Sequence, residues 1–392
     1  MSPARPREGA RTAVRSTEVT QILRFAATLS VCLGLSALAG CSSDKPKPTP
    51  LEAITPAIAG RQVWSANVDA LPFVLLPSAK NDAFVVAGGD GSVVALSARD
   101  GAQLWRGDVG ARLSAGVGSD GRYAAVVTRD NELVVLDGGA VKWRTRLGSL
   151  VSTAPLVAGE RVFVMGVDRA VQAYDVTDGR YLWALRRPGE PLTLSQPGVV
   201  GAFKDTLLVG QGQRLTGVDP LRGSVRWEVP LANPRGTNEV ERVADLVGPL
   251  SRAGDVVCAR AFQQAVGCAN AQSGTLLWSK NIGGSQAVGA DAELVAGADG
   301  SGRITAWRAN NGDLAWTAEQ LLHRDLSGLL VVGRTVIVGD FEGQVHFLDR
   351  TNGKTLLRLP TDGSPVIGAP VALGNTVLVS TKKGGLFAFR PE

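Results

Sequence analysis

The residues that could carry out catalysis are few and far apart in this chain of 392 residues. Its two histidines, His323 and His346, lie in different segments, whereas a Ser-His-Asp or Cys-His arrangement needs a histidine beside the nucleophile. No His-x-x-x-His, Cys-x-x-Cys or acidic calcium loop occurs in the sequence. His346 stands in the apolar run Gln344–Leu348 and is expected to be a hydrogen-bonded strand residue. We therefore predict no catalytic residue, no metal site and no cofactor.

Cys41 follows a leader that is typical of secretion. Arginines precede a 15-residue apolar run, Phe25–Ala39, which suits a signal peptide and is short for a bilayer span. The run ends in Leu-Ala-Gly-Cys, which resembles the lipobox of bacterial lipoproteins; an ordinary signal sequence cleaved elsewhere is the alternative. The resemblance implies cleavage before Cys41 and acylation of this residue. Because Ser42 and Ser43 follow instead of Asp, it also implies a lipid anchor on the periplasmic face of the outer membrane.

Cys258 and Cys268 are the other two cysteines outside the apolar run of the leader. They flank a predicted turn and face each other across antiparallel strands if the turn has an odd number of residues, such as Phe262–Gln264. A cross-strand disulfide can then form in an oxidising compartment. Two buried free thiols are the alternative.

The chain divides into three predicted parts. Residues 1–40 are the lipoprotein signal peptide, and residues 41–60 are a lipidated tether in which alternating prolines favour an extended, disordered spacer. Residues 61–392 carry a repeated pattern. The leader holds 5 of the 41 Lys and Arg and 2 of the 36 Asp and Glu, so the rest has 36 basic and 34 acidic groups and a net charge of +2. This balance lacks the basic footprint of a nucleic-acid-binding protein.

The repeated pattern is clearest in Phe84–Trp105, where three short apolar runs are separated by Asp90-Gly91 and Asp100-Gly101. Asp-Gly between apolar runs predicts a hairpin with a type I′ turn, whose two central residues both have positive φ. A large apolar residue closes each copy of the pattern. These marker residues lie 38 to 51 positions apart and are Trp64, Trp105, Trp143, Trp183, Trp227, Trp278, Trp316 and Leu357.

A period near 40 residues with four strands in each repeat predicts a β-propeller. Seven copies are complete, and the eighth, Val377–Phe389, lacks a last strand that Arg61–Val68 can supply. We therefore predict an all-β, eight-bladed propeller with four antiparallel strands in each blade. The N-terminal strand completes the last blade and closes the ring, which removes an exposed sheet edge. We interpret the markers as wedges between blades, each indole N–H finding an acceptor, and not as stacking platforms.

Two connections between blades stand out. Residues 231–247 form the longest connection, which is polar and acidic and contains Arg242 and Asp245; residues 184–196, in the preceding connection, contain Leu192 and Leu194. Equivalent connections share one face of a propeller, so these two segments should lie side by side. Apolar side chains rimmed by charge favour a protein-binding patch. The alternative is that both leucines cap the hydrophobic core.

The repeats can be compared with known families. Residues 95–105 (ALSARDGAQLW) and 268–278 (CANAQSGTLLW) resemble the pyrroloquinoline-quinone-type propeller repeat. Quinone-dependent dehydrogenases and the BamB family of outer-membrane assembly lipoproteins both carry this repeat. The lipobox, the tether, the chain length and the long connections favour the BamB family, as do residues 237–245, 319–324 and 338–343.

The BamB resemblance implies a non-enzymatic scaffold. Such a scaffold binds the POTRA domains of BamA, works with other assembly subunits and helps to fold β-barrels into the outer membrane; nascent barrel chains are further candidate partners. The family's partner-binding positions map onto Leu192, Leu194 and Asp245. Ser195 stands where an arginine is usual and Val247 where a second acidic residue is usual, so the ionic part of the contact departs from the family pattern.

Two alternatives remain on the sequence. A quinone-dependent dehydrogenase is disfavoured, because those enzymes are longer, many carry a vicinal Cys pair, and the loops here are too short to build a quinone pocket. A propeller that binds glycans or peptidoglycan is the other alternative.

Overall fold

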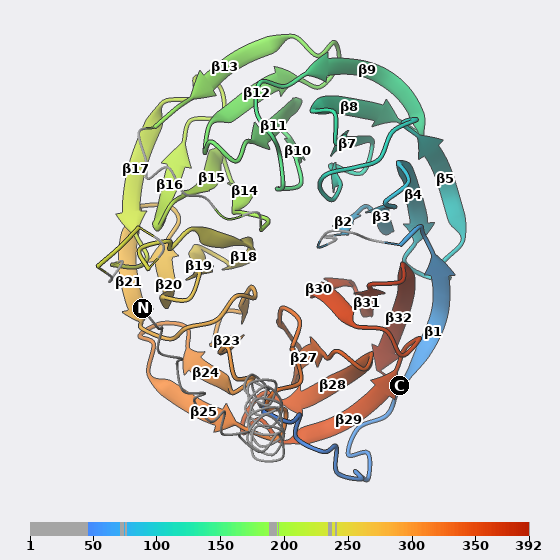
Figure 1. Ribbon diagram of the computed structural model, residues 1–392, viewed down its shortest axis with the longest axis vertical. Helices are drawn as coiled ribbons and strands as arrows, with labels where there is room; N and C mark the ends of the chain where they lie inside the picture. Colours follow the sequence, from blue (N-terminus) through green and yellow to red (C-terminus); the bar gives the residue numbers. More distant parts are fainter. Residues whose placement is uncertain are drawn as a thin grey trace, which may run out of the picture. The chain divides into compact units, whose positions relative to one another are not determined.

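The computed structural model describes residues 46–70, 74, 77–187, 194, 196–233, 237–239 and 241–391. Residues 48–392 form one compact unit, and residues 1–47 form a separate unit of which only Pro46 and Lys47 are described. The larger unit is a ring of eight four-stranded antiparallel sheets (Figure 1). Within the described ranges there is no helix of the length and apolarity that a membrane crossing requires. The predicted eight-bladed, all-β propeller is confirmed.

The first four blades follow the chain in order. Blade 1 contains β2 (Ser78–Lys80), β3 (Ala83–Ala87), β4 (Ser92–Ser97) and β5 (Gln103–Asp108). Blade 2 contains β6 (Gly118–Ser119), β7 (Tyr123–Val127), β8 (Glu132–Asp137) and β9 (Ala140–Arg146). Blade 3 contains β10 (Leu156–Ala158), β11 (Arg161–Met165), β12 (Val171–Asp175) and β13 (Tyr181–Leu185). Blade 4 contains β14 (Val200–Phe203), β15 (Thr206–Gln211), β16 (Arg214–Val218) and β17 (Val225–Pro230).

The remaining blades complete the circle. Blade 5 contains β18 (Leu246–Ala253), β19 (Val256–Ala261), β20 (Ala265–Asn270) and β21 (Thr275–Lys280). Blade 6 contains β22 (Gly289–Ala290), β23 (Leu294–Ala298), β24 (Ile304–Arg308) and β25 (Leu314–Ala318). Blade 7 contains β26 (Leu330–Val332), β27 (Thr335–Gly339), β28 (Gln344–Asp349) and β29 (Thr355–Pro360). Blade 8 contains β30 (Val366–Leu373), β31 (Thr376–Thr381), β32 (Gly385–Pro391) and β1 (Gly60–Asn67).

In each blade the four strands lie side by side, the first nearest the centre of the ring and the fourth at its rim (Figure 1). Because neighbouring strands are antiparallel, the turn between the second and third strands lies on the same face as the connection to the next blade. We call this the connection face. The turns between the first and second strands and between the third and fourth strands lie on the opposite face, which we call the turn face.

The eighth blade is assembled from both ends of the propeller. β1 pairs with β32 from Gly60 opposite Pro391 to Asn67 opposite Gly385, which places the N-terminal strand outermost, as predicted. Backbone hydrogen bonds between these two strands therefore close the ring, and no turn joins them.

The turn type was predicted wrongly. β3 and β4 are separated by residues 88–91, and of the predicted central pair only Gly91 has positive φ (104°). The carboxylate of Asp90 instead accepts hydrogen bonds from the backbone N–H and the hydroxyl of Ser92, at 2.9 and 2.7 Å. An aspartate side chain thus closes the turn, and glycine supplies a single left-handed residue.

The marker residues lie in the outermost strands and pack against the following blade. A Cβ on Gly101 would come within 2.7 Å of the Trp64 ring, so the glycine turn of the next blade fits directly onto the indole. Five indole N–H groups donate to backbone carbonyls of the next blade, at 2.7 to 3.2 Å: Trp64 to Ala98, Trp143 to Val176, Trp183 to Pro220, Trp278 to Ala309 and Trp316 to Arg350. Each tryptophan is therefore a wedge with a fixed orientation.

Part of the predicted tether packs against the ring, which corrects the expectation of disorder up to residue 60. Thr49 donates a backbone hydrogen bond to Leu322 (3.0 Å), and Ala57 donates one to Leu356 in β29 (2.8 Å). The apolar side chains that join the blade cores are Leu51 and Ile58. We call residues 48–59 the strap. Alternating prolines favour an extended chain whether or not that chain is docked, so composition could not distinguish a strap from a free tether.

Candidate functional site

The two connections singled out in the sequence meet on the connection face. The backbone N–H of Leu194, between β13 and β14, donates to the carboxylate of Asp245, between β17 and β18, at 3.3 Å. Gly248 also donates to the carbonyl of Pro197 at 2.8 Å. These contacts join segments about 50 positions apart, and the prediction that they lie side by side agrees with the geometry.

Arg169 fixes this junction. Its Nε donates to Oδ1 of Asp245 at 2.9 Å, and the two side chains are only 14% and 16% exposed. Both oxygens of the Asp245 carboxylate thus accept a hydrogen bond, one from Arg169 and one from the Leu194 backbone. Charge-assisted hydrogen bonds of low exposure are stronger than surface ion pairs. The role of Asp245 is therefore to position the Leu194 segment.

The sequence analysis did not identify Arg169. Its unusual backbone conformation marks it in the structure. Arg169 occupies the turn between β11 and β12 with positive φ (61°), a conformation that is costly for a residue with a Cβ. Five blades place a glycine with positive φ in this turn: Gly91, Gly212, Gly302, Gly343 and Gly384. An arginine in a turn that glycine usually serves indicates a required side chain.

The other predicted site residues, the lipidation site among them, fall into two groups. Cys41, Leu192 and Ser195 lie outside the described residues. Arg242 is half-buried in a turn, where its backbone N–H donates to the Asn238 carbonyl at 3.3 Å.

The prediction that Val247 belongs to the partner-binding connection is wrong. It belongs to strand β18 rather than to the connection, pairs with Arg260 and is 5% exposed. Its side chain is therefore part of the core, and we leave it out of the contact surface.

Cys258 and Cys268 are bonded to each other. They lie directly opposite in β19 and β20, with Cα atoms 4.1 Å apart and sulfurs at 1.98 Å. The turn between the strands consists of residues 262–264, the odd-numbered loop that the pairing requires.

A second cluster, around Asp340, lies under the strap. Asp340 is fully buried, and its Oδ2 accepts from Arg324 Nε (2.8 Å) and lies 3.0 Å from His346 Nε2. Burial alone would raise the pKa of Asp340, but hydrogen bonds from His346, the Gln344 backbone and Arg324 lower it below 3.8. The ionised carboxylate thus holds two stretches together that the family resemblance had highlighted, residues 319–324 and 338–343.

This cluster fastens the strap to blade 7. Arg324 Nη1 donates to the carbonyl of Thr49 at 3.1 Å, and Arg358 Nη1 donates to the carbonyl of Glu52 at 3.0 Å. Arg358 also donates from Nε to Nδ1 of His346 at 3.3 Å. Hydrogen bonds therefore connect the buried carboxylate of Asp340 to the strap.

His346 is neutral in this setting. An arginine N–H can only donate, so Nδ1 of His346 is the acceptor and Nε2 carries the proton that it donates to Asp340. Burial lowers the pKa of His346 below 6.5, against the opposing effect of Asp340. Both ring nitrogens are used, so the histidine serves as a structural strand residue.

The stability of the protein should therefore fall as the pH drops below 6.5. The unfolded chain protonates His346 there while the folded chain does not, so unfolding is favoured by up to about 1.4 kcal/mol per pH unit until the lowered folded pKa is reached. Urea denaturation of the wild type at pH 7.5, 6.0 and 5.0 measures this slope, and His346→Gln should reduce it. The control His323→Gln removes the other imidazole; loss of the slope there and not in His346→Gln would contradict the account.

Among the residues described, no three or more His, Cys, Asp or Glu side chains are grouped so that they could hold a metal ion. On the connection face, the described geometry is that of a backbone segment at Leu194 held in place by the internal ion pair of Arg169 and Asp245.

Comparisons with known proteins show which family this chain resembles. The family model described as "Outer membrane protein assembly factor BamB" matches residues 89–318 and 320–392. Proteins of that name from Burkholderia pseudomallei and Bordetella pertussis are 36% and 33% identical, over 94% and 92% of this chain and 99% and 96% of their own lengths.

Solved structures show the same fold. BamB from Moraxella catarrhalis superposes with a TM-score of 0.76 at 20% identity, covering 84% of this chain and 99% of that one. Quinohemoprotein alcohol dehydrogenase from Comamonas testosteroni reaches 0.63 at 15% identity, covering 85% and 76%. Since both identities are low, these likenesses concern the fold alone. The family model and the two curated relatives decide the family, and the chain belongs to that of the outer membrane protein assembly factor BamB.

Proposed function

We propose that this protein is a lipid-anchored, non-enzymatic scaffold of the machinery that assembles β-barrels in the outer membrane. It binds the POTRA region of BamA through the connection face, and so assists the folding and insertion of barrel proteins. The observation that carries the proposal is the contact of Leu194 with Asp245, which joins two connections into one surface fixed by Arg169.

The proposed contact is mainly apolar. Leu192 and Leu194 supply the side chains, and burying one leucine contributes about 1.5–3 kcal/mol. Asp245 is engaged inside the protein, and Ser195 and Val247 replace the charged residues usual in the family. Affinity therefore rests on the leucines and on how firmly their segment is held, as at other interfaces with a few dominant residues.

The strap supports the orientation of such a scaffold. Thr49 contacts Leu322 and Arg324, both in the connection between β25 and β26. This connection lies on the same face as Leu194. The N-terminal end of the strap therefore lies on the proposed partner-binding face.

Arg169→Ala should weaken binding to the BamA POTRA region about 10-fold, equivalent to about 1.4 kcal/mol, because the Leu194 segment loses its support. Titration of the two proteins by calorimetry measures this change. Arg129→Ala, an exposed arginine on the same face, is the matched control and should bind as the wild type does. Equal affinity of Arg169→Ala and the control, with both variants folded, would refute a positioning role.

Cys41→Ser should release the protein from the membrane. Without acylation the chain keeps only protein contacts to the assembly machinery, whereas acyl chains add about 0.8 kcal/mol per buried methylene. Fractionation of cells should move the variant from the outer membrane to the soluble periplasmic fraction. A variant that still sediments with the outer membrane, in cells depleted of BamA, would show that lipid is not the main anchor.

A further inference from the structure

The junction between blades 7 and 8 is built differently from the other seven. Its marker is Leu357 instead of a tryptophan, and the residue opposite the marker in the third strand is Phe347. At the other junctions this opposite residue is small: Ala95, Val135, Ala173, Gly217, Cys268, Ala306 and Ala388. The large ring has thus moved from the outermost strand to the third strand of the blade.

The side of this junction that belongs to blade 8 also differs from its equivalents in the other blades. Elsewhere the marker packs under a glycine turn that joins the third and fourth strands of the next blade, as Trp316 does under Gly353. In blade 8 the third and fourth strands are β32 and β1, which no turn joins. The end of the strap, residues 57–59, lies there instead.

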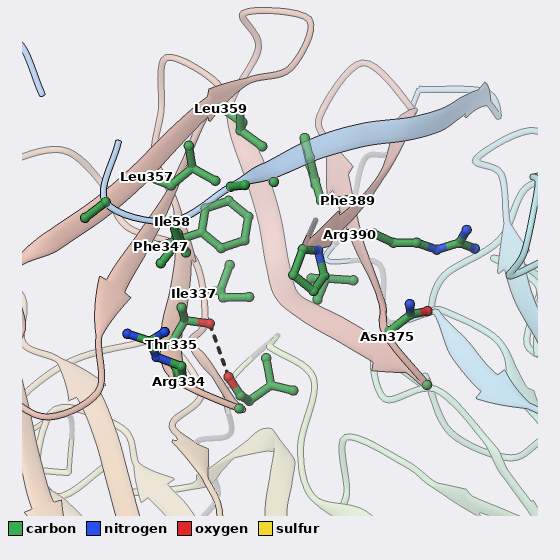
Figure 2. Close-up of a pocket in the computed structure, with 18 residues that line it drawn as sticks. Ile58, Arg334, Thr335, Ile337, Phe347, Leu357, Leu359, Asn375, Phe389 and Arg390 are labelled. Atoms are coloured by element: carbon green, nitrogen blue, oxygen red, sulfur yellow. Dashed lines mark hydrogen bonds between the residues drawn. The ribbon is translucent and has the colours of Figure 1, made fainter. Parts of the chain in front are cut away.

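These two differences leave a cavity of about 430 Å³ on the turn face, between β29, β32 and the strap (Figure 2). Its apolar wall includes Ile58, Ile337, Phe347, Leu357, Val377 and Phe389. Figure 2 shows the labelled side chains of this wall gathered around the cavity, with the guanidinium group of Arg334 directed away from it at the rim. An apolar cavity of about 150 Å³ is enough to bind benzene, so this one can take a larger ring.

We propose that this cavity receives an aromatic side chain of a partner protein, in the place that a marker indole fills at the other junctions. Each of the five bonded marker indoles donates to a carbonyl in the third strand of the next blade or just beyond it, three residues after the residue that lies opposite that next blade's own marker. Trp64 thus donates to Ala98, three residues after Ala95, and Trp316 donates to Arg350, three residues after Phe347. The equivalent carbonyl in blade 8 belongs to Pro391, which lines the cavity. Phe347 and Phe389, with centroids 6.2 Å apart at 79°, offer the edge and face contacts that aromatic rings prefer.

The cavity is separate from the surface proposed for BamA. Its rim includes Gly333 and Gly374, in turns between first and second strands, and these turns lie on the turn face. Leu194 and Asp245 lie on the connection face. Both sites can therefore be occupied at once, and a variant of one should leave the other unchanged.

The test uses the chain with Cys41→Ser, which needs no detergent, and two peptide probes, Gly-Gly-Trp-Gly-Gly and Gly-Gly-Leu-Gly-Gly. We expect the tryptophan peptide to bind saturably with Kd on the order of 1 mM and the leucine peptide to bind at least about 10-fold more weakly, as measured by calorimetry. Leu357→Trp should fill the cavity and abolish binding, and so should Ile337→Phe, which serves if the first variant misfolds. Leu314→Trp, which places an indole at an exposed site on blade 6, should bind as the wild type does.

Each other outcome counts against the proposal. Equal binding of the two peptides would overturn the preference for an aromatic ring. Binding that persists in both folded cavity variants would place the site elsewhere. Binding of free indole without binding of the tryptophan peptide would replace the protein partner with a small aromatic molecule. Absence of binding by peptide and indole would exclude the site.

Discussion

Replacing Leu192 and Leu194 together by aspartate is expected to abolish co-purification of BamA with the protein. Each substitution removes about 1.5–3 kcal/mol of apolar burial and adds a carboxylate that would be desolvated in the contact, so the affinity should fall at least about 100-fold. Affinity purification of the tagged full chain from its native membranes measures the loss.

The same variant distinguishes the two interpretations of the leucines. If they belong to the contact surface, the variant should unfold in urea at the wild-type midpoint. If they cap the hydrophobic core, the midpoint should fall and binding should be lost only because the fold is lost. Leu104→Asp with Leu314→Asp is the matched control, because both leucines are exposed on outermost strands of other blades. Retained BamA binding by a folded Leu192→Asp, Leu194→Asp variant would refute the proposed site.

Asp340→Ala is expected to cost about 3–5 kcal/mol of unfolding free energy, the usual range for removing one partner of a buried ion pair. The substitution leaves Arg324, which is 3% exposed, without its buried carboxylate, and it removes the acceptor of the His346 proton. It also removes the acceptor for the backbone N–H groups of Glu342 and Gln344, at 3.0 and 2.9 Å. Because Arg324 holds the strap at Thr49, protease cleavage within residues 48–59 should become faster.

Asp90→Ala is the control for this prediction. Asp90 closes the equivalent turn of blade 1 through Ser92 but is exposed and has no buried arginine or histidine partner among the described contacts. It should lose only about 1 kcal/mol, the value of a closing hydrogen bond. Urea denaturation gives both free energies, and equal losses in the two variants would show that the buried cluster contributes nothing beyond the turn.

The ring could be predicted because the same local sequence features recur in every blade. A glycine turn, a marker tryptophan and a run of apolar residues recur near every 40 positions, and the split last blade follows from counting strands. The strap could not be predicted, because its docking depends on Arg324 and Arg358, which lie about 270 to 310 positions away. Val247 was misassigned for a similar reason: it becomes a strand residue by pairing with Arg260.

The candidate site was predictable in place but not in its internal contacts. Topology brings the two connections together on one face, so the segments that contain Leu194 and Asp245 could be predicted to lie side by side. The identity of the supporting cation could not, since Arg169 lies 76 positions from Asp245.

Arg260 illustrates the same limit. It is completely buried and donates to the carbonyls of Ile282, Gly283, Gln286 and Ala298 at 2.8 to 3.2 Å. Burial lowers its pKa to about 10, so it remains charged at neutral pH. No local pattern marks a cation held only by backbone carbonyls.

The most direct measurement is a binding titration between the purified chain carrying Cys41→Ser and the POTRA region of BamA from the same organism. We expect the chain with its wild-type leucines to form a saturable complex through the connection face. The folded Leu192→Asp, Leu194→Asp variant should form no complex. Absence of any complex between the two folded wild-type proteins would contradict the proposed function and leave the propeller and its family membership unchanged.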